Sequence, residues 1–232
     1  MRFSEIGIGL ALFALSTGLA VAQTRTMTVR GAGEVLVAPD LATVRLGLTH
    51  QAESAAEAQN EVNRVAGRIL EVIRGLGIPE ESIRTVDLSL HAIYASVRRP
   101  DDQPRIIGYR ASNVVAVRTD DLERVGPIID AGLQAGANRV EGVQFGLASD
   151  ESARREALQR AADDARRKAE ALAEAMGVRL LEVDEINEEG VTVPVREAFL
   201  ERTMAMDAST PVSPGQLSVS ARVSLKYSIS RR

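Results

Sequence analysis

The chain has 232 residues, of which 45% are apolar and 26% are charged, and its formal net charge at pH 7 is −4. These proportions are typical of a folded protein of one or two domains and exclude wholesale disorder. The balanced charge argues against a nucleic-acid partner. Because the sequence has no cysteine and only two histidines, disulfides, iron–sulfur clusters, thiol chemistry and most zinc sites are excluded.

The N-terminus has the pattern of an export signal. A short basic start is followed by an uncharged apolar run from Ile6 to Leu19, and Ala20-Val21-Ala22 then forms a small-x-small motif before Gln23. The run is shorter than the ~20 residues of a relaxed membrane span. We therefore expect a signal peptide of residues 1–22 that is cleaved before Gln23, with an uncleaved membrane anchor as the alternative.

The remaining chain, residues 23–232, is expected to be a single exported domain without a transmembrane span. No other segment is long and apolar enough to cross a bilayer. Its five aromatic rings are scattered along the sequence, so they cannot form a platform on which bases stack. Nucleic acid is therefore not expected as a partner.

The first half of this domain alternates between the periods of strands and helices. Residues 26–37 and 44–48 have the two-residue alternation of strands, and Gly31 and Gly33 interrupt the first one, which favours a β-bulge. A helix is expected from Ser54, where Glu57 completes a capping-box sequence, to about residue 76.

The middle of the chain continues with short strands and one helix. Strands are expected at 86–90, 107–117 and 143–147, and a helix at 121–134. Pro127 lies inside that helix and lacks an N–H, so we expect a kink or a helix that starts late. The element order from Val44 to Leu147 is that of a ferredoxin-like βαββαβ core.

The last third predicts a long helix over 151–176 and two strands, 178–186 and 217–229. The apolar face of the helix is expected to comprise Leu158, Ala161, Ala162, Ala165, Ala169, Leu172 and Met176. Between the strands, residues 188–214 have no clear pattern and are expected to form an irregular or mobile loop. The predicted class is α+β, a mostly antiparallel sheet with helices on one face, in which the ferredoxin-like core is extended by these elements and by the N-terminal strand.

Four sequence motifs resemble those of the SIMPL-domain family, whose members include bacterial periplasmic immunogenic and oxidative-stress defence proteins. The motifs are GYRASN at 108–113, AGAN at 135–138, ARRKAE at 165–170 and TPVSPG at 210–215. They occur in order across essentially the whole exported chain. The resemblance implies a periplasmic α+β protein, often assembled into large homo-oligomers. It brings no agreed catalytic residues with it.

The residues themselves predict no catalytic or cofactor site. His50 and His91 each lack a second histidine at metal-ligand spacing, and Ser112 is interpreted as an ordinary strand residue. Met204 and Met206 are the only candidate metal ligands, because thioethers bind Cu(I), but two of them alone would bind weakly. Sacrificial oxidation to the sulfoxide, or a loop that merely tolerates methionine, are the alternatives.

These observations favour a non-enzymatic periplasmic protein that acts as a homo-oligomeric scaffold in envelope or oxidative-stress protection. Open sheets leave edge groups that must be paired or covered, and symmetric self-association can cover them. A loose association with the outer membrane or the envelope is compatible with this function. The alternative is a periplasmic protein that binds a metal or a small ligand, with Met204 and Met206 as a weak copper site.

Overall fold

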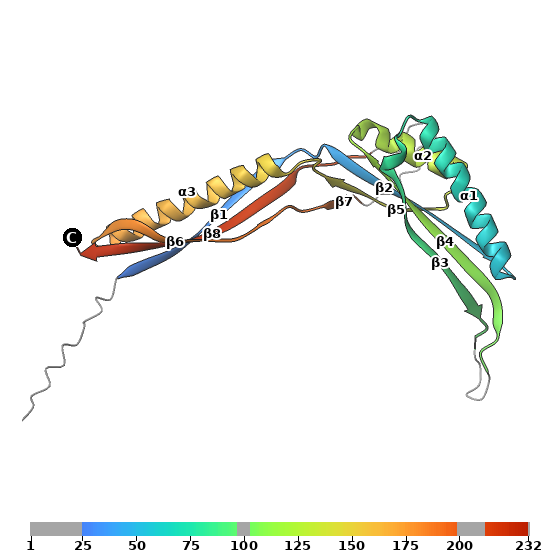
Figure 1. Ribbon diagram of the computed structural model, residues 1–232, viewed down its shortest axis with the longest axis horizontal. Helices are drawn as coiled ribbons and strands as arrows, with labels where there is room; N and C mark the ends of the chain where they lie inside the picture. Colours follow the sequence, from blue (N-terminus) through green and yellow to red (C-terminus); the bar gives the residue numbers. More distant parts are fainter. Residues whose placement is uncertain (1–24, 97–102, 199–211, 232) are drawn as a thin grey trace, which may run out of the picture.

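The structure, a computed structural model, describes residues 25–96, 103–198 and 212–231. Its strands form two antiparallel sheets, and helices cover only one face of each (Figure 1). The predicted α+β class is confirmed, but the strands do not extend a single sheet: each sheet has a hydrophobic core of its own. Figure 1 shows the two parts meeting at a bend, with the helices on the outer side and the uncovered sheet faces on the inner side.

The larger sheet takes all but one of its strands from residues 41–146, and we call it with its two helices the α1/α2 lobe. Its strand order is β3-β4-β2-β5-β7. The strands are β2 (Leu41–Ala52), β3 (Ile83–Tyr94), β4 (Ile106–Thr119), β5 (Arg139–Gly146) and β7 (Arg196–Ala198). All neighbouring strands are antiparallel. The ferredoxin-like arrangement itself stays a prediction.

Helices α1 (Ala55–Gly75) and α2 (Val125–Ala135) pack on one face of this sheet. The hydroxyl of Ser54 accepts a hydrogen bond from the Glu57 amide at 3.2 Å, which confirms the predicted start of α1. A short 3-10 turn, Leu122–Arg124, precedes α2, so Pro127 falls in the first turn of a helix that starts late, as expected. In the first turn the missing N–H of proline costs no intrahelical bond.

The smaller sheet has the order β1-β8-β6, and we call it with its helix the α3 lobe. Its elements are β1 (Thr26–Val37), α3 (Glu151–Ala175), β6 (Val178–Thr192) and β8 (Leu217–Arg231). The alternating apolar residues of the last strand face α3: Leu217, Val219, Ala221, Val223, Leu225 and Tyr227 are all buried. The predicted half-buried strand is confirmed, and it is the central strand of its sheet.

The expected β-bulge at Gly31 and Gly33 is wrong. Strand β1 pairs with β8 in one continuous register from Thr26 to Val37. The glycines are there because α3 lies directly against the backbone of β1: a Cβ on Gly31 would sit 2.0 Å from the carbonyl oxygen of Ala161, and a Cβ on Gly33 2.1 Å from that of Ala157. The absent side chains allow the close approach of helix and strand.

The predicted apolar face of the long helix is partly wrong. The buried residues of α3 are all alanines four positions apart: Ala153, Ala157, Ala161, Ala165, Ala169 and Ala173. Of the residues expected on that face, Ala162, Leu172 and Met176 are exposed. A helix that packs this closely on a strand needs small side chains at the contact, so the larger residues lie at its flanks.

The segment expected to be irregular, residues 188–214, is partly regular. Strand β6 continues to Thr192, six residues beyond its expected end at Ile186, because it pairs with β8 as far as Ser220. Strand β7 then pairs with β5 at the edge of the larger sheet. Val212 packs against the core of the α1/α2 lobe.

Candidate functional site

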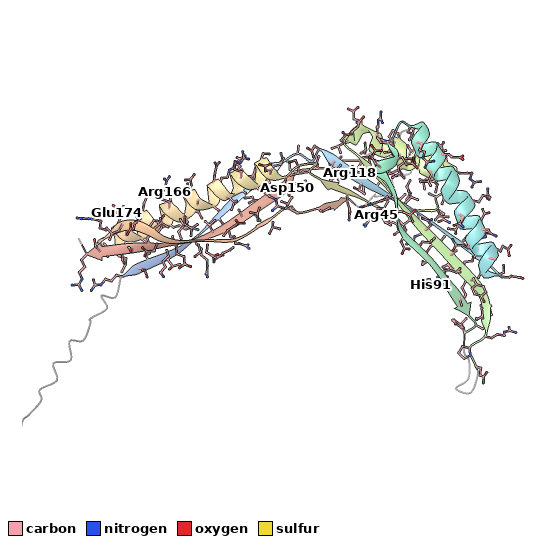
Figure 2. All side chains as sticks on the ribbon, viewed as in Figure 1. Arg45, His91, Arg118, Asp150, Arg166 and Glu174 are labelled. Atoms are coloured by element: carbon pink, nitrogen blue, oxygen red, sulfur yellow. The ribbon has the colours of Figure 1, made fainter. Side chains whose placement is uncertain are left out.

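The two histidines do not form a site. His50 pairs in register with Ala111 and His91 with Arg110, so they lie on opposite faces of the larger sheet with β4 between them. Both are exposed, and Figure 2 shows His91 toward the far end of β3. Within the described ranges no three His, Asp or Glu side chains are grouped so that they could hold a metal ion. Met204 and Met206 lie outside the described residues.

A hollow of about 500 Å³ beside the N-terminal half of α1 is lined by His50 and by polar side chains of the helix. The Arg64 guanidinium hydrogen-bonds Glu61 and lowers the pKa of its carboxyl below the ordinary value of 4.5. Glu61 is therefore committed to its neighbour on the same helix face, which gives a solvated ion pair and not a site for catalysis.

A groove of about 470 Å³ runs over the uncovered face of the larger sheet. Its polar lining includes Ser112, whose hydroxyl shares a hydrogen bond of 2.7 Å with the hydroxyl of Ser89. On the other side of the groove Arg139 forms an ion pair of 2.8 Å with Glu141. Because Ser112 is bonded to another hydroxyl and not to a base, it lacks the partner that activates a serine nucleophile. The groove therefore offers polar side chains but no serine paired with an activating base.

The outer edge of β1 is closed by one flank of α3. Three side chains at successive helix turns bind edge groups of the strand. Arg160 donates to the Glu34 carbonyl at 2.5 Å, Asp164 accepts from the Ala32 amide at 2.9 Å, and Lys168 donates to the Arg30 carbonyl at 3.1 Å. Such charged side chains at an edge prevent another strand from pairing with it.

Strand β3 is the opposite case, an edge strand with apolar side chains left in the open. Leu88 and Leu90 pair in register with Asn113 and Ala111, so they lie on the same face of the sheet as the core. Helix α1 packs mainly on β4 and β2 and leaves them uncovered, with Leu88 57% exposed. We call these two residues the β3 rim.

The α3 lobe repeats this arrangement at its own edge. Val183 and Ile186 of β6 pair in register with Tyr227 and Leu225, both members of the core. Helix α3 packs mainly on β1 and β8, and Ile186 is 72% exposed. We call Val183 and Ile186 the β6 rim. In the described part of the chain, neither β3 nor β6 has a row of side-chain hydrogen bonds like the one that closes β1.

The edge groups and rims could not be located from the sequence. Alternation shows that Leu88 and Leu90 share a face with the core but not that the helix stops short of them. The row of Arg160, Asp164 and Lys168 has the four-residue spacing of a solvated helix face, as does the rest of α3. None of the helices in the described ranges is long and apolar enough to cross a membrane.

Comparison with known proteins gives consistent matches along the chain. The family model of SIMPL, described as a protein of unknown function (DUF541), matches residues 27–227. The 26 kDa periplasmic immunogenic protein of Brucella melitensis is 30% identical over 220 residues, which are 89% of this chain and 86% of the relative. The uncharacterized protein YggE of Edwardsiella ictaluri is 29% identical over 150 residues, which are 65% of this chain and 62% of the relative.

Proposed function

The chain belongs to the SIMPL family, and on that premise we propose that it is an exported periplasmic protein that acts as a homo-oligomeric scaffold and not through turnover. Residues 1–22 are its cleaved signal peptide and residues 23–232 the working protein. Its place in the periplasm is supported by the Brucella relative, which is named a periplasmic protein. A role in envelope or oxidative-stress protection rests on the family resemblance alone.

The observation that carries the proposal is the contrast between the edges of the sheets. Side chains of α3 close the edge of β1, whereas β3 and β6 present open edges next to the β3 rim and the β6 rim. An open edge offers unpaired N–H and C=O groups, and apolar side chains beside it add burial at about 25 cal/mol per Å². Copies of the chain that meet through these strands would pair the backbone groups of the edges and bury the apolar side chains beside them.

The two rims lie on different lobes at the two arms of the bent molecule (Figure 1). A chain with one such surface can only pair, whereas two different surfaces allow a chain to link two neighbours. Repetition of that contact closes into a ring or continues as a fibre. A closed ring is the soluble outcome, so we expect one defined mass for the assembly.

The test is the mass of residues 23–232 in solution, measured by light scattering on a column peak across the micromolar range. We expect several times the mass of one chain. The double variants Leu88→Lys with Leu90→Lys, and Val183→Lys with Ile186→Lys, place charges on the β3 rim and the β6 rim and should each reduce that mass.

Leu36→Lys is the matched control. Leu36 is 59% exposed, as much as Leu88, but it lies on β1, whose edge α3 closes. This variant should keep the mass of the parent protein. A concentration-independent mass of one chain for the parent protein rules out the scaffold, and equal effects of all three variants would overturn the choice of edges.

A further inference from the structure

A second hollow on the uncovered face of the larger sheet, with a volume of about 420 Å³, plays no part in the proposed assembly. Ala116 of β4 forms its floor. In register, Ala116 pairs with Arg84 of β3 on one side and with Arg45 of β2 on the other. Arg118 follows two residues along β4, on the same face. Figure 2 shows Arg118 and Arg45 near the bend of the molecule.

The residue at the base of this hollow has a short side chain, whereas the residues around it have long ones. No α-helix covers this face, but the 3-10 turn Glu80–Ser82 packs against β4 beside the hollow, and Ala116 is only 2% exposed. Because paired residues in an antiparallel sheet point to the same face, the long side chains beside Ala116 stand around and over its methyl group. The result is a cup with an alanine at its base and arginine side chains in its wall.

The cup has an excess of hydrogen-bond donors. Arg84 and Arg118 line it, and neither forms an ion pair within the described residues, whereas Arg154, Arg155 and Arg160 of α3 each do. The hydroxyls of Thr43 and Ser82 also line the cup. Among the lining side chains Glu81 is the one carboxylate, so the positive charges outnumber the negative one.

We propose that this cup binds the phosphate group of a small phosphorylated molecule. Two guanidinium forks and two hydroxyls present more donors than the two oxygens of a carboxylate can accept, whereas a phosphate monoester offers three terminal oxygens and a charge of about −1.5 to −2 at pH 7. Leu41 and Leu147 supply an apolar wall for the rest of the molecule. The volume lies within the range of ~300–1,000 Å³ typical of small-molecule sites.

The probe for the test is phenyl phosphate, titrated calorimetrically into residues 23–232, with phenol as the uncharged control. We expect saturable binding of phenyl phosphate and none of phenol. The double variant Arg84→Gln with Arg118→Gln should weaken binding by about tenfold or more, since it removes two charge-assisted contacts. Arg222→Gln is the matched control: Arg222 is an exposed arginine on the uncovered face of the other sheet and should not matter.

A variant with higher affinity tests the cup independently of whether the double variant folds correctly, because misfolding would not tighten binding. Glu81→Gln removes the carboxylate of the cup and should tighten binding by about threefold, the scale of a screened surface charge. Absence of saturable binding, binding of phenol as strong as that of phenyl phosphate, or equal losses in the double variant and in Arg222→Gln would each overturn the proposal.

The phosphate could belong to a soluble metabolite or to a lipid head group, and a flotation experiment distinguishes them. Vesicles of phosphatidylcholine that contain phosphatidic acid present the same monoester at a membrane, whereas vesicles of phosphatidylcholine alone present only a phosphodiester and serve as the control. Flotation that depends on phosphatidic acid and is lost in the double variant assigns a lipid head group to the cup. Binding of phenyl phosphate without flotation assigns a soluble ligand, and both outcomes support the cup as the phosphate site.

Discussion

The carboxylate of Asp164 accepts a hydrogen bond of 2.9 Å from the backbone amide of Ala32, 132 residues earlier in the chain. That amide belongs to the outer edge of β1, and the same carboxylate is held by Lys168 at 2.7 Å. One helix residue therefore both anchors α3 to the sheet and occupies an edge donor that another strand would need.

Replacement of Asp164 should loosen this contact. Asp164→Ala leaves the Ala32 amide to solvent and removes the partner of Lys168. We expect a loss of about 1 kcal/mol, less than the ~1.5–3 kcal/mol of a hydrogen bond to a charged group, because solvent screens this contact. Asp163→Ala is the control, because among the described residues Asp163 pairs only with Arg166, at 3.3 Å on the exposed side of the helix. Urea unfolding of both variants measures the difference, and equal losses would contradict the role given to Asp164.

The same contact should make the stability of the fold depend on pH in the acid range. The hydrogen bond from Lys168, followed by that from the Ala32 amide, lowers the pKa of the Asp164 carboxyl below its ordinary value of 3.8. A lowered pKa in the folded state contributes stability that is present above the unfolded pKa and is lost as pH falls through the folded one. Stability should therefore fall below about pH 4, and Asp164→Asn should flatten that part of the curve. Unfolding curves from pH 2.5 to 7 test it, and identical acid slopes in both proteins would exclude the effect.

A glycine at the contact between helix and strand should be irreplaceable. Gly31→Ala places a methyl group 2.0 Å from the Ala161 carbonyl oxygen and 2.6 Å from the Ala165 amide nitrogen, so α3 must move away from β1. We expect a loss of at least about 1–3 kcal/mol, the cost of an overpacked core.

The control substitution is expected to change the free energy of unfolding in the opposite direction. Gly67 lies inside α1, and a Cβ there would meet no atom within 4 Å. Gly67→Ala should therefore stabilise the protein by roughly 0.5–1 kcal/mol, the difference in helix propensity between the two residues. Thermal unfolding of both variants gives the comparison, and a neutral Gly31→Ala would mean that the helix does not lie this close.

The sequence predicted features whose causes lie close together in the chain. Ser54 and Glu57 are three residues apart, Pro127 acts on its own helix, and the alternation from Leu217 onward belongs to one strand. Each was confirmed because local backbone chemistry decides it.

The features that the sequence did not predict depend on partners far along the chain. A glycine in a strand indicates either a bulge or a close neighbour, and only the position of α3 shows that Gly31 and Gly33 are of the second kind. Leu172 and Met176 fit the spacing of a helical apolar face as well as the alanines do. Only the alanines are buried, because large side chains do not fit where the helix packs this closely on the strand. The division into two sheets, and therefore the open rims, follows from strand pairing, which a two-residue period does not encode.

Because the two lobes have separate cores, we expect a destabilising substitution in one lobe to leave the other lobe folded. Val219 belongs to the core of the α3 lobe and Ile69 to that of the α1/α2 lobe, and both are fully buried. Because no residue belongs to both cores, Val219→Asp, which buries a charge without a partner, should raise amide hydrogen exchange in β1, β8 and α3 while α1 and β4 stay protected. Ile69→Asp should give the reverse pattern. Exchange that rises equally in both lobes for either variant would show that the two cores unfold as one unit.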